Sequence, residues 1–142
     1  MPSFTARVAN LEQVGPVVEV RLAVGRALEA VLQKQGQEVP TALTVRGMID
    51  TGATETVIAQ DIPGQLGLKP VGIATITTAS STNVKCYEYL LRIILPNGVT
   101  GEAVAIALPL RGRHIYCLLG RDMLRHAVLI YNGYMETFTL SF

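Results

Sequence analysis

Asp50 is the carboxylate whose sequence surroundings best suit chemistry. It ends an apolar segment, Met48-Ile49, and is followed by Thr51-Gly52-Ala53 before a second apolar segment begins near Thr56. Because glycine permits a tight turn, we expect Asp50 at the tip of a loop between two buried strands. A carboxylate held at a loop tip can act as an acid or a base. The plainer alternative is an ordinary turn in which Asp50 and Thr51 bond to nearby backbone.

The chain has two other aspartates, and both occupy less suitable places. Asp61 precedes a segment typical of one helical turn, so a capping role is favoured over catalysis. Asp122 lies near the start of a short helix predicted over 121–126, where a carboxylate is favoured by the helix dipole. His114 and His126 have no Cys or carboxylate pattern around them, so we predict no metal site and no cofactor.

Composition excludes several function classes. Lys and Arg are dispersed and number 12, and aromatic residues make up only 6%, so nucleic-acid binding is not expected. No apolar run approaches the roughly 20 residues of a membrane helix. Charged residues make up only 16% and apolar residues 49%, which favours burial of some apolar surface against another subunit.

The two cysteines, Cys86 and Cys117, are too few for a disulfide framework. The first residues lack the basic and then apolar pattern of a secretion signal, so we expect a cytoplasmic protein with reduced thiols. Cys117 lies in an apolar segment and is expected to be a buried small hydrophobe. Cys86 has no obvious base that would make it a nucleophile.

The elements that must position Asp50 are mostly strands. Residues 1–41 are predicted to supply a strand over 17–24 and a helical excursion over 27–35. A strand over 42–49 delivers Asp50, and another follows at 57–58. The second half is predicted to be β, with strands over 73–79, 84–95, 99–108 and 115–119 and a closing hairpin over 127–142. At 142 residues, the chain fits one domain, 1–142.

Four features in order resemble the retropepsin-like aspartic peptidases, the retroviral protease type with its cellular and bacterial relatives. They are the loop Asp50-Thr51-Gly52-Ala53, a hairpin centred near 80–83, the segment Leu118-Leu119-Gly120-Arg121-Asp122, and a short helix leading to a final hairpin. The resemblance covers 42–142, which would form the catalytic core. It implies a closed β-barrel of the acid protease fold, a single lobe with a flap hairpin and one or two short helices.

The resemblance also implies an activity. Members are endopeptidases in which two aspartates share one proton and activate water. Since Asp50 is the one usable aspartate, the dyad requires a homodimer in which Asp50 faces its own copy across a two-fold axis. Thr51 would hydrogen-bond across that axis, and Gly52 would let the backbone approach a peptide substrate. A catalytically silent dimer that serves as a binding or assembly module is the alternative.

Further residues receive roles from the same resemblance. Peptide contacts would come from Ala53, Thr54 and Glu55 on the loop and from the flap over about 77–86, at Ala79, Ser80, Ser81 and Thr82. The flap tip lacks the glycines of retroviral members, which leaves the way in which the flap opens undetermined.

Leu119, Gly120, Arg121 and Asp122 would support the site structurally. Retroviral members carry an aspartate after the loop alanine as the partner of this arginine, whereas this chain has Thr54. Arg121 would pair with Glu55, with the other subunit or with no carboxylate, and the Glu55 pair is favoured as the commoner outcome. The alternative for Glu55 is a substrate pocket that favours basic side chains.

Overall fold

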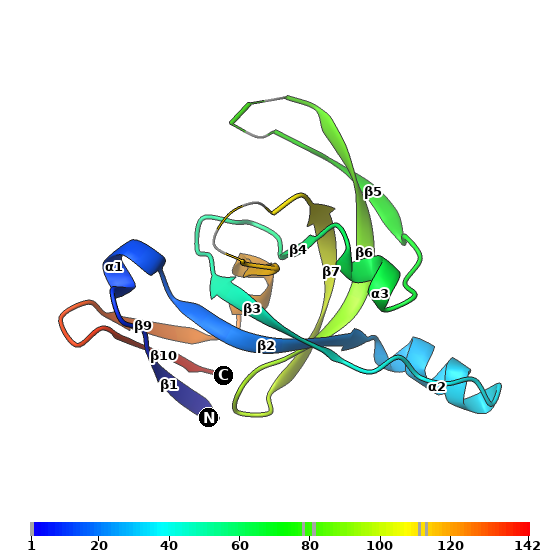
Figure 1. Cartoon of the computed structure of the whole chain (residues 1–142), viewed down its shortest axis with the longest axis horizontal. Coiled ribbons are helices and arrows are strands. Elements are labelled where there is room, and N and C mark those ends of the chain that lie inside the picture. The colour runs from blue at the N-terminus through cyan, green and yellow to red at the C-terminus, as the bar shows by residue number, and fades with distance from the viewer. Residues whose placement is uncertain (1, 78, 81, 111, 113) are drawn as a thin grey trace.

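The computed structural model describes residues 2–77, 79–80, 82–110, 112 and 114–142, and its strands form two sheets (Figure 1). The larger sheet has seven strands in the order β2-β3-β8-β4-β7-β6-β5. A further antiparallel pairing of β2 with β6 closes the first six of them into a barrel. The larger sheet comprises β2 (Val17–Val24), β3 (Leu43–Ile49), β4 (Val57–Ala59), β5 (Gly72–Ile76), β6 (Val84–Ile94), β7 (Thr100–Leu108) and β8 (Cys117–Leu119).

The smaller sheet has three strands in the order β1-β10-β9 and lies beside the barrel (Figure 1). Its strands are β1 (Ser3–Arg7), β9 (Val128–Asn132) and β10 (Thr137–Ser141). Both pairings are antiparallel. Because β1 pairs with β10, the first and last strands of the chain are neighbours. The helices are α1 (Leu11–Val14), α2 (Arg26–Lys34), α3 (Ile62–Gln65) and α4 (Arg121–Leu124).

The core follows from the alternation of apolar residues along the barrel strands. Val20, Leu22 and Val24 on β2 are at most 1% exposed, and they meet Leu91 and Ile93 of β6, both fully buried. Each such side chain contributes about 1.5–3 kcal/mol when removed from water. The smaller sheet joins the same core through the buried side chains of β10, Phe138 and Leu140.

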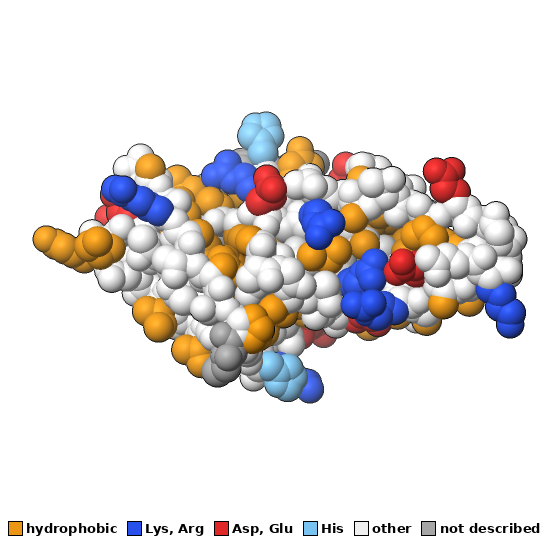
Figure 2. All heavy atoms as spheres, turned by 90° about the horizontal axis from the view of Figure 1, so that it is seen from below, with side chains coloured by type: hydrophobic (Ala, Val, Ile, Leu, Met, Phe, Trp, Pro, Cys, Tyr) orange, Lys and Arg blue, Asp and Glu red, His pale blue; other side chains and the backbone are white. Residues whose placement is uncertain are grey.

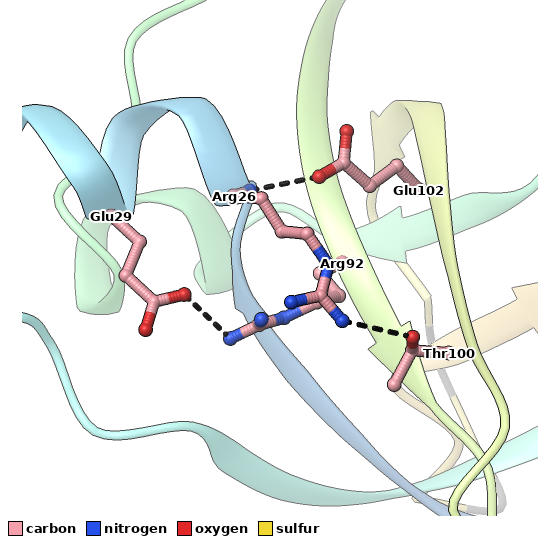
Figure 3. A network of polar contacts seen from close by, with 5 residues as sticks. All are labelled: Arg26, Glu29, Arg92, Thr100 and Glu102. Carbon is pink, nitrogen blue, oxygen red and sulfur yellow. Dashed lines mark hydrogen bonds and ion pairs between the residues drawn. The ribbon is translucent and has the colours of Figure 1, made fainter.

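Helix α2 projects from the barrel and is held at its N-terminal end (Figures 1 and 3). The backbone N–H of Arg26 donates to Glu102 Oε1 at 2.8 Å, and its guanidinium donates to Thr100 Oγ1 at 3.4 Å. Glu29 forms an ion pair with Arg92 at 3.1 Å. No residue of α2 is buried, so polar contacts to β6 and β7 rather than core packing fix this helix.

The mostly β fold predicted from the sequence is confirmed, and the predicted strands and helices match the observed ones to within a few residues. The main difference is at the start of the chain, where the sequence pattern predicted neither β1 nor α1. Strand β1 is short and pairs only with β10, so its stability depends on residues at least 130 positions away. Within the described part of the chain, no helix is long and apolar enough to span a membrane.

Candidate active site

Asp50 directly follows β3 at a point where three strands meet. Strand β8 lies between β3, to which it is parallel, and β4, to which it is antiparallel. The backbone N–H of Asp50 donates to the carbonyl of Leu119 at 2.9 Å, which continues the β3–β8 pairing by one residue. The Asp50 side chain is therefore attached to a backbone position that is fixed by strand pairing, and the residue is half-buried.

Gly52 has a different role from the one expected. Its φ lies outside the left-handed region, so the turn does not depend on the conformational freedom of glycine. Its N–H instead donates to Asp50 Oδ1 at 2.9 Å, and a Cβ at this position would lie 3.2 Å from that oxygen. Ala53 N–H bonds to the Asp50 carbonyl at 3.2 Å. The missing side chain thus leaves the carboxylate uncrowded while the backbone orients it.

The first residues of α4 hold the loop from the other side. The backbone N–H of Arg121 donates to the Ala53 carbonyl at 2.9 Å, and that of Asp122 donates to the Thr54 carbonyl at 3.1 Å. The Arg121 guanidinium adds bonds to the Thr51 carbonyl at 2.7 Å and to Thr54 Oγ1 at 3.0 Å. Backbone and side-chain donors from α4 therefore fix the position of the loop.

The favoured pairing of Arg121 with Glu55 is wrong. Arg121 binds a carbonyl and the hydroxyl of Thr54, which takes the place of a carboxylate. Among the described residues, the one ion pair is Arg92–Glu29, so Glu55 stays exposed and unpaired there. The fork of the guanidinium explains the outcome, because it reaches two oxygens of the adjacent loop without bending back toward Glu55.

A buried polar network lies behind the loop, and its centre was missed by the sequence analysis. Thr56 is fully buried, and its hydroxyl donates to Asp122 Oδ1 at 2.8 Å while accepting the N–H of Gly120 at 3.2 Å. The N–H of Thr56 donates to Asp122 Oδ2 at 3.0 Å. The buried polar atoms satisfy one another. The sequence offered one signal for a buried hydroxyl here: Thr56 directly precedes the apolar residues Val57 and Ile58.

The network also affects its apolar neighbour Cys117. Its thiol is fully buried, as expected, and burial followed by the negative charge of Asp122 raises the pKa of Cys117 to about 12. Burial likewise raises the pKa of Cys86, which is 7% exposed. Both thiols therefore stay protonated near neutral pH, which is unsuited to nucleophilic chemistry.

Gly120 sits where two backbone segments touch. A Cβ there would lie 2.5 Å from the carbonyl carbon of Glu55 and 2.8 Å from the backbone nitrogen of Thr56. Leu119, the preceding residue, is 1% exposed and anchors β8 in the core. Only a residue without a side chain lets β8 pass this close to the loop, which accounts for glycine between Leu119 and Arg121.

The flap predicted from the sequence is a hairpin of β5 and β6, with Gly72 paired to Glu88 and Ile76 to Val84. It rises beyond the end of the barrel at which the β3–β4 loop lies (Figure 1). The proposed peptide contacts Ala79, Ser80 and Thr82 are exposed, whereas Ser81 lies outside the described residues. No hydrogen bond joins the described tip residues to the loop at 50–56.

Asp61 stands at the N-cap of α3 without capping it through its side chain, contrary to the expected role. Its carboxylate accepts a bond from Gln65 Nε2 at 3.0 Å instead. Across the described ranges, no group of three His, Cys, Asp or Glu residues could hold a metal ion.

Two cavities border the loop. One of about 570 Å³ is lined by Glu55 and Asp122 but not by Asp50. The other, of about 410 Å³, is lined by Thr51, Arg121, Leu124, Arg125, Ala127 and Leu129. Thr51 is exposed, and its hydroxyl has no hydrogen-bond partner among the described residues.

Comparisons with known proteins give the following matches. Residues 41–126 match a family model described as gag-polyprotein putative aspartyl protease. Among solved structures, the chain resembles a retropepsin-like aspartic protease from Rickettsia conorii, with a TM-score of 0.50 and 12% identity over 99% of this chain and 94% of that one. This match shows the retropepsin-like fold. A search of curated protein sequences finds no match.

Two further structures are similar at lower scores. One is the EIAV protease in complex with the inhibitor HBY-793, with a TM-score of 0.48 and 17% identity over 83% of this chain and 91% of that one. The other is the retroviral protease-like domain of Ddi1 from Leishmania major, with a TM-score of 0.46 and 8% identity over 83% of this chain and 82% of that one.

Proposed function

Because this chain belongs to the family of gag-polyprotein putative aspartyl proteases, we propose that it is an aspartic endopeptidase. Two copies would join so that Asp50 faces Asp50 of the partner subunit. The observation that carries the proposal is the setting of Asp50. Its carboxylate is half-buried, oriented by the Gly52 N–H at 2.9 Å and mounted on a loop that α4 holds in place.

The need for a second copy follows from the aspartates. Asp61 bonds to Gln65, and both oxygens of Asp122 accept bonds from Thr56. Asp50 is thus the one aspartate of the three that remains available for substrate. An aspartic dyad needs two carboxylates, so a two-fold homodimer supplies the second.

The proposed chemistry uses the two carboxylates in opposite roles. Side by side they cannot both ionise, so they share one proton. The ionised carboxylate removes a proton from water as its oxygen attacks the peptide carbonyl carbon, and the protonated carboxylate donates to the carbonyl oxygen. The tetrahedral intermediate then collapses when a proton reaches the amide nitrogen and the C–N bond breaks.

The neighbours of Asp50 would hold the site and the peptide. The Thr51 hydroxyl is unpartnered within the described residues, which supports a bond to the opposite loop across the two-fold axis. Gly52 would accept a peptide N–H through its carbonyl. The Glu55 carboxylate is exposed and not engaged by Arg121, so it would contact the substrate and favour basic side chains. The flap hairpin would close over the bound peptide and exclude water.

A silent dimer that acts as a binding or assembly module is the second candidate. The observation that favours it is the exposed flap tip, where Ala79, Ser80 and Thr82 provide no glycine hinge. The setting of Asp50 favours catalysis, because a binding module has no need of an oriented carboxylate on a fixed loop.

The test is cleavage of an unfolded protein between roughly pH 3 and pH 8, a range in which a carboxylate dyad can share its proton. Asp50→Asn should lower the rate at least about 10³-fold, because both members of the dyad change. Asp61→Asn is the matched control and should cleave like the wild type, since Asp61 is exposed. Full activity in Asp50→Asn would refute the proposal. Folded dimers without activity in all three proteins would favour the binding module.

A further inference from the structure

A cavity of about 570 Å³ beside the loop that carries Asp50 has no part in the chemistry proposed above. Glu55 lines it and Asp50 does not, so the cavity lies next to the place of bond cleavage and not at it. Glu88 of β6 and Glu102 of β7 form part of its wall, and Met123 of α4 forms another part. The cavity is thus a concave site to which the proposed chemistry assigns no ligand.

The cavity lies where a bound peptide would continue beyond the site. Glu55 follows Asp50 in the same loop. Glu88 is the partner of Gly72 in the pairing of β5 with β6, at the end of the flap hairpin away from its tip. A Cβ at Gly72 would lie 3.0 Å from Glu88 Oε1, so this carboxylate lies against the flap hairpin. A peptide that is covered by the flap and extends past Glu55 therefore reaches the cavity.

Negative charge predominates in the lining. Its acidic members are four carboxylates, those of Glu55, Glu88, Glu102 and Asp122. Two basic residues, Arg125 and His126, also line the cavity, and Arg125 Nε donates to His126 Nε2 at 2.8 Å. A ring nitrogen that accepts a hydrogen bond carries no proton, so the imidazole is neutral in this arrangement. Four carboxylates are therefore opposed by one guanidinium, and the cavity attracts cations.

The four carboxylates differ in how far the protein itself engages them. Asp122 accepts three hydrogen bonds from neighbouring groups. Glu102 accepts the Arg26 N–H at 2.8 Å (Figure 3). Within the ranges that the structure describes, Glu55 and Glu88 accept no hydrogen bond and form no ion pair. These two carboxylates remain available to a ligand.

The cavity also has an apolar part. Leu95 and Ala103 in its lining are 3% and 8% exposed, and Val99 lines it as well. Met123 reaches over β7, where a Cβ at Gly101 would lie 2.8 Å from Met123 Cε. A ligand with an apolar stem and a cationic end fits this combination. Arginine fits it better than lysine, because the planar fork of a guanidinium can bind two carboxylates at once.

We propose that this cavity binds an arginine side chain of the peptidase substrate, at a position outside the residues that flank the cleaved bond. The guanidinium would bind Glu55 and Glu88, and the aliphatic stem would pack against Met123. On the face shown in Figure 2, by contrast, acidic and basic side chains are interspersed. The inference deepens the proposed function and rests on it for the identification of the ligand as substrate.

The binding test uses the full chain with Asp50→Asn, which keeps a probe peptide intact. The probe is a blocked hexapeptide that alternates arginine and leucine, titrated by isothermal calorimetry. Adding Glu88→Gln should raise its Kd roughly tenfold, because a charge-assisted hydrogen bond is lost. Glu12→Gln, an exposed glutamate of α1 outside the lining, is the matched control and should leave the Kd unchanged.

Two further measurements separate the cavity from the fold and from the rest of the peptide. Urea unfolding of Glu88→Gln should match that of Glu12→Gln, because the change keeps the size of a half-buried side chain. The same hexapeptide with citrulline, a neutral analogue of arginine, should bind at least about tenfold more weakly, and Glu88→Gln should not weaken it further. An unchanged Kd in Glu88→Gln, or an equal loss with the citrulline peptide, would overturn the arginine site.

Cleavage kinetics connect the cavity to the proposed activity. With Asp50 intact, Glu88→Gln should raise KM for an arginine-rich unfolded protein roughly tenfold with little change in kcat, because the lost contact lies away from the reacting carboxylates. Arginine-dependent binding in a wild type that cleaves nothing would retain the arginine site and refute the peptidase. Cleavage by the wild type with the same KM in Glu88→Gln would retain the peptidase and refute the arginine site.

Discussion

The loop that carries Asp50 and the flap hairpin both connect strands, but the rest of the chain holds them to different degrees. The loop that carries Asp50 donates a hydrogen bond to the Leu119 carbonyl of β8 and accepts hydrogen bonds from both the backbone and the side chain of Arg121. The flap hairpin is held by the pairing of β5 with β6, and β5 is the open edge of the larger sheet. The tip residues described, such as Ser80, are exposed.

The difference matches what each part must do in a peptidase. A reacting carboxylate has to stay within a fraction of an ångström of its productive position, which requires bracing from several directions. A flap has to admit a peptide and then cover it, so it is drawn from the less stable parts of a fold. Substitutions in the loop support should therefore cost stability and rate, and those at the flap tip should cost little stability.

The largest effect is expected at Gly120. In Gly120→Ala the new Cβ would lie 2.5 Å from the backbone of Glu55, which cannot move without displacing the loop. We expect a loss of about 3 kcal/mol in unfolding free energy, measured by urea denaturation. Gly64→Ala is the control, because no atom lies within 4 Å of its Cβ, and it should be neutral or slightly stabilising. Equal behaviour of the two variants would contradict the close approach.

Thr56→Val should have the next largest effect. It keeps the shape of the side chain but removes the hydroxyl that links Asp122 to the Gly120 N–H. The buried Gly120 N–H then loses its partner, and Asp122 Oδ1 keeps only its bond from the Met123 N–H. The expected cost is about 2 kcal/mol, measured by thermal and urea unfolding. Thr44→Val, on the exposed face of β3, should stay within about 0.5 kcal/mol of the wild type. A neutral Thr56→Val would show that the network does not support the loop.

Arg121→Lys should affect rate more than stability. A lysine cannot reach both the Thr51 carbonyl and the Thr54 hydroxyl, so the loop loses one of its braces. We expect kcat to fall roughly tenfold or more, with less than about 1 kcal/mol lost in stability because the side chain is exposed. Arg46→Lys, exposed on β3, is the control. An unchanged kcat would show that the Arg121 side-chain contacts do not contribute to the rate.

The smallest effect on stability is expected at the flap. Ser80→Gly removes an exposed side chain at the tip and should change unfolding free energy by less than about 0.5 kcal/mol. Its effect should appear in KM, because the proposed function places the tip against substrate and not against the core. A stability loss near that of Thr56→Val would show that the tip is packed, and the contrast between loop and flap would then fail.

Much of this architecture was predictable because the signals are local. The β-branched run of β2, the Pro96-Asn97-Gly98 turn and the helix formers of α2 each carry their own preference. The loop at Asp50 and the Leu119-Gly120 segment occur in the same order as in the retropepsin-like peptidases, which made the resemblance recognisable. Their combination predicted the barrel, the flap and the site.

The remaining features depend on contacts between distant residues. Strand β1 forms because β10 is beside it, and no local pattern marks it. The partners of Arg121 and the burial of Thr56 depend on how α4 docks on the loop, which spacing alone does not specify. Gly52 was assigned to the right place for a different reason, since orientation of the carboxylate rather than backbone freedom explains it.

The central claim is that each active site takes one Asp50 from each of two copies, and mixing tests it directly. Wild type and Asp50→Asn should be combined in equal amounts, allowed to exchange subunits, and compared with pure wild type at the same total concentration. Random pairing leaves about a quarter of the dimers fully wild type, so activity should fall to about a quarter. A fall to only one half would mean that each chain carries a complete site, which would contradict the shared dyad.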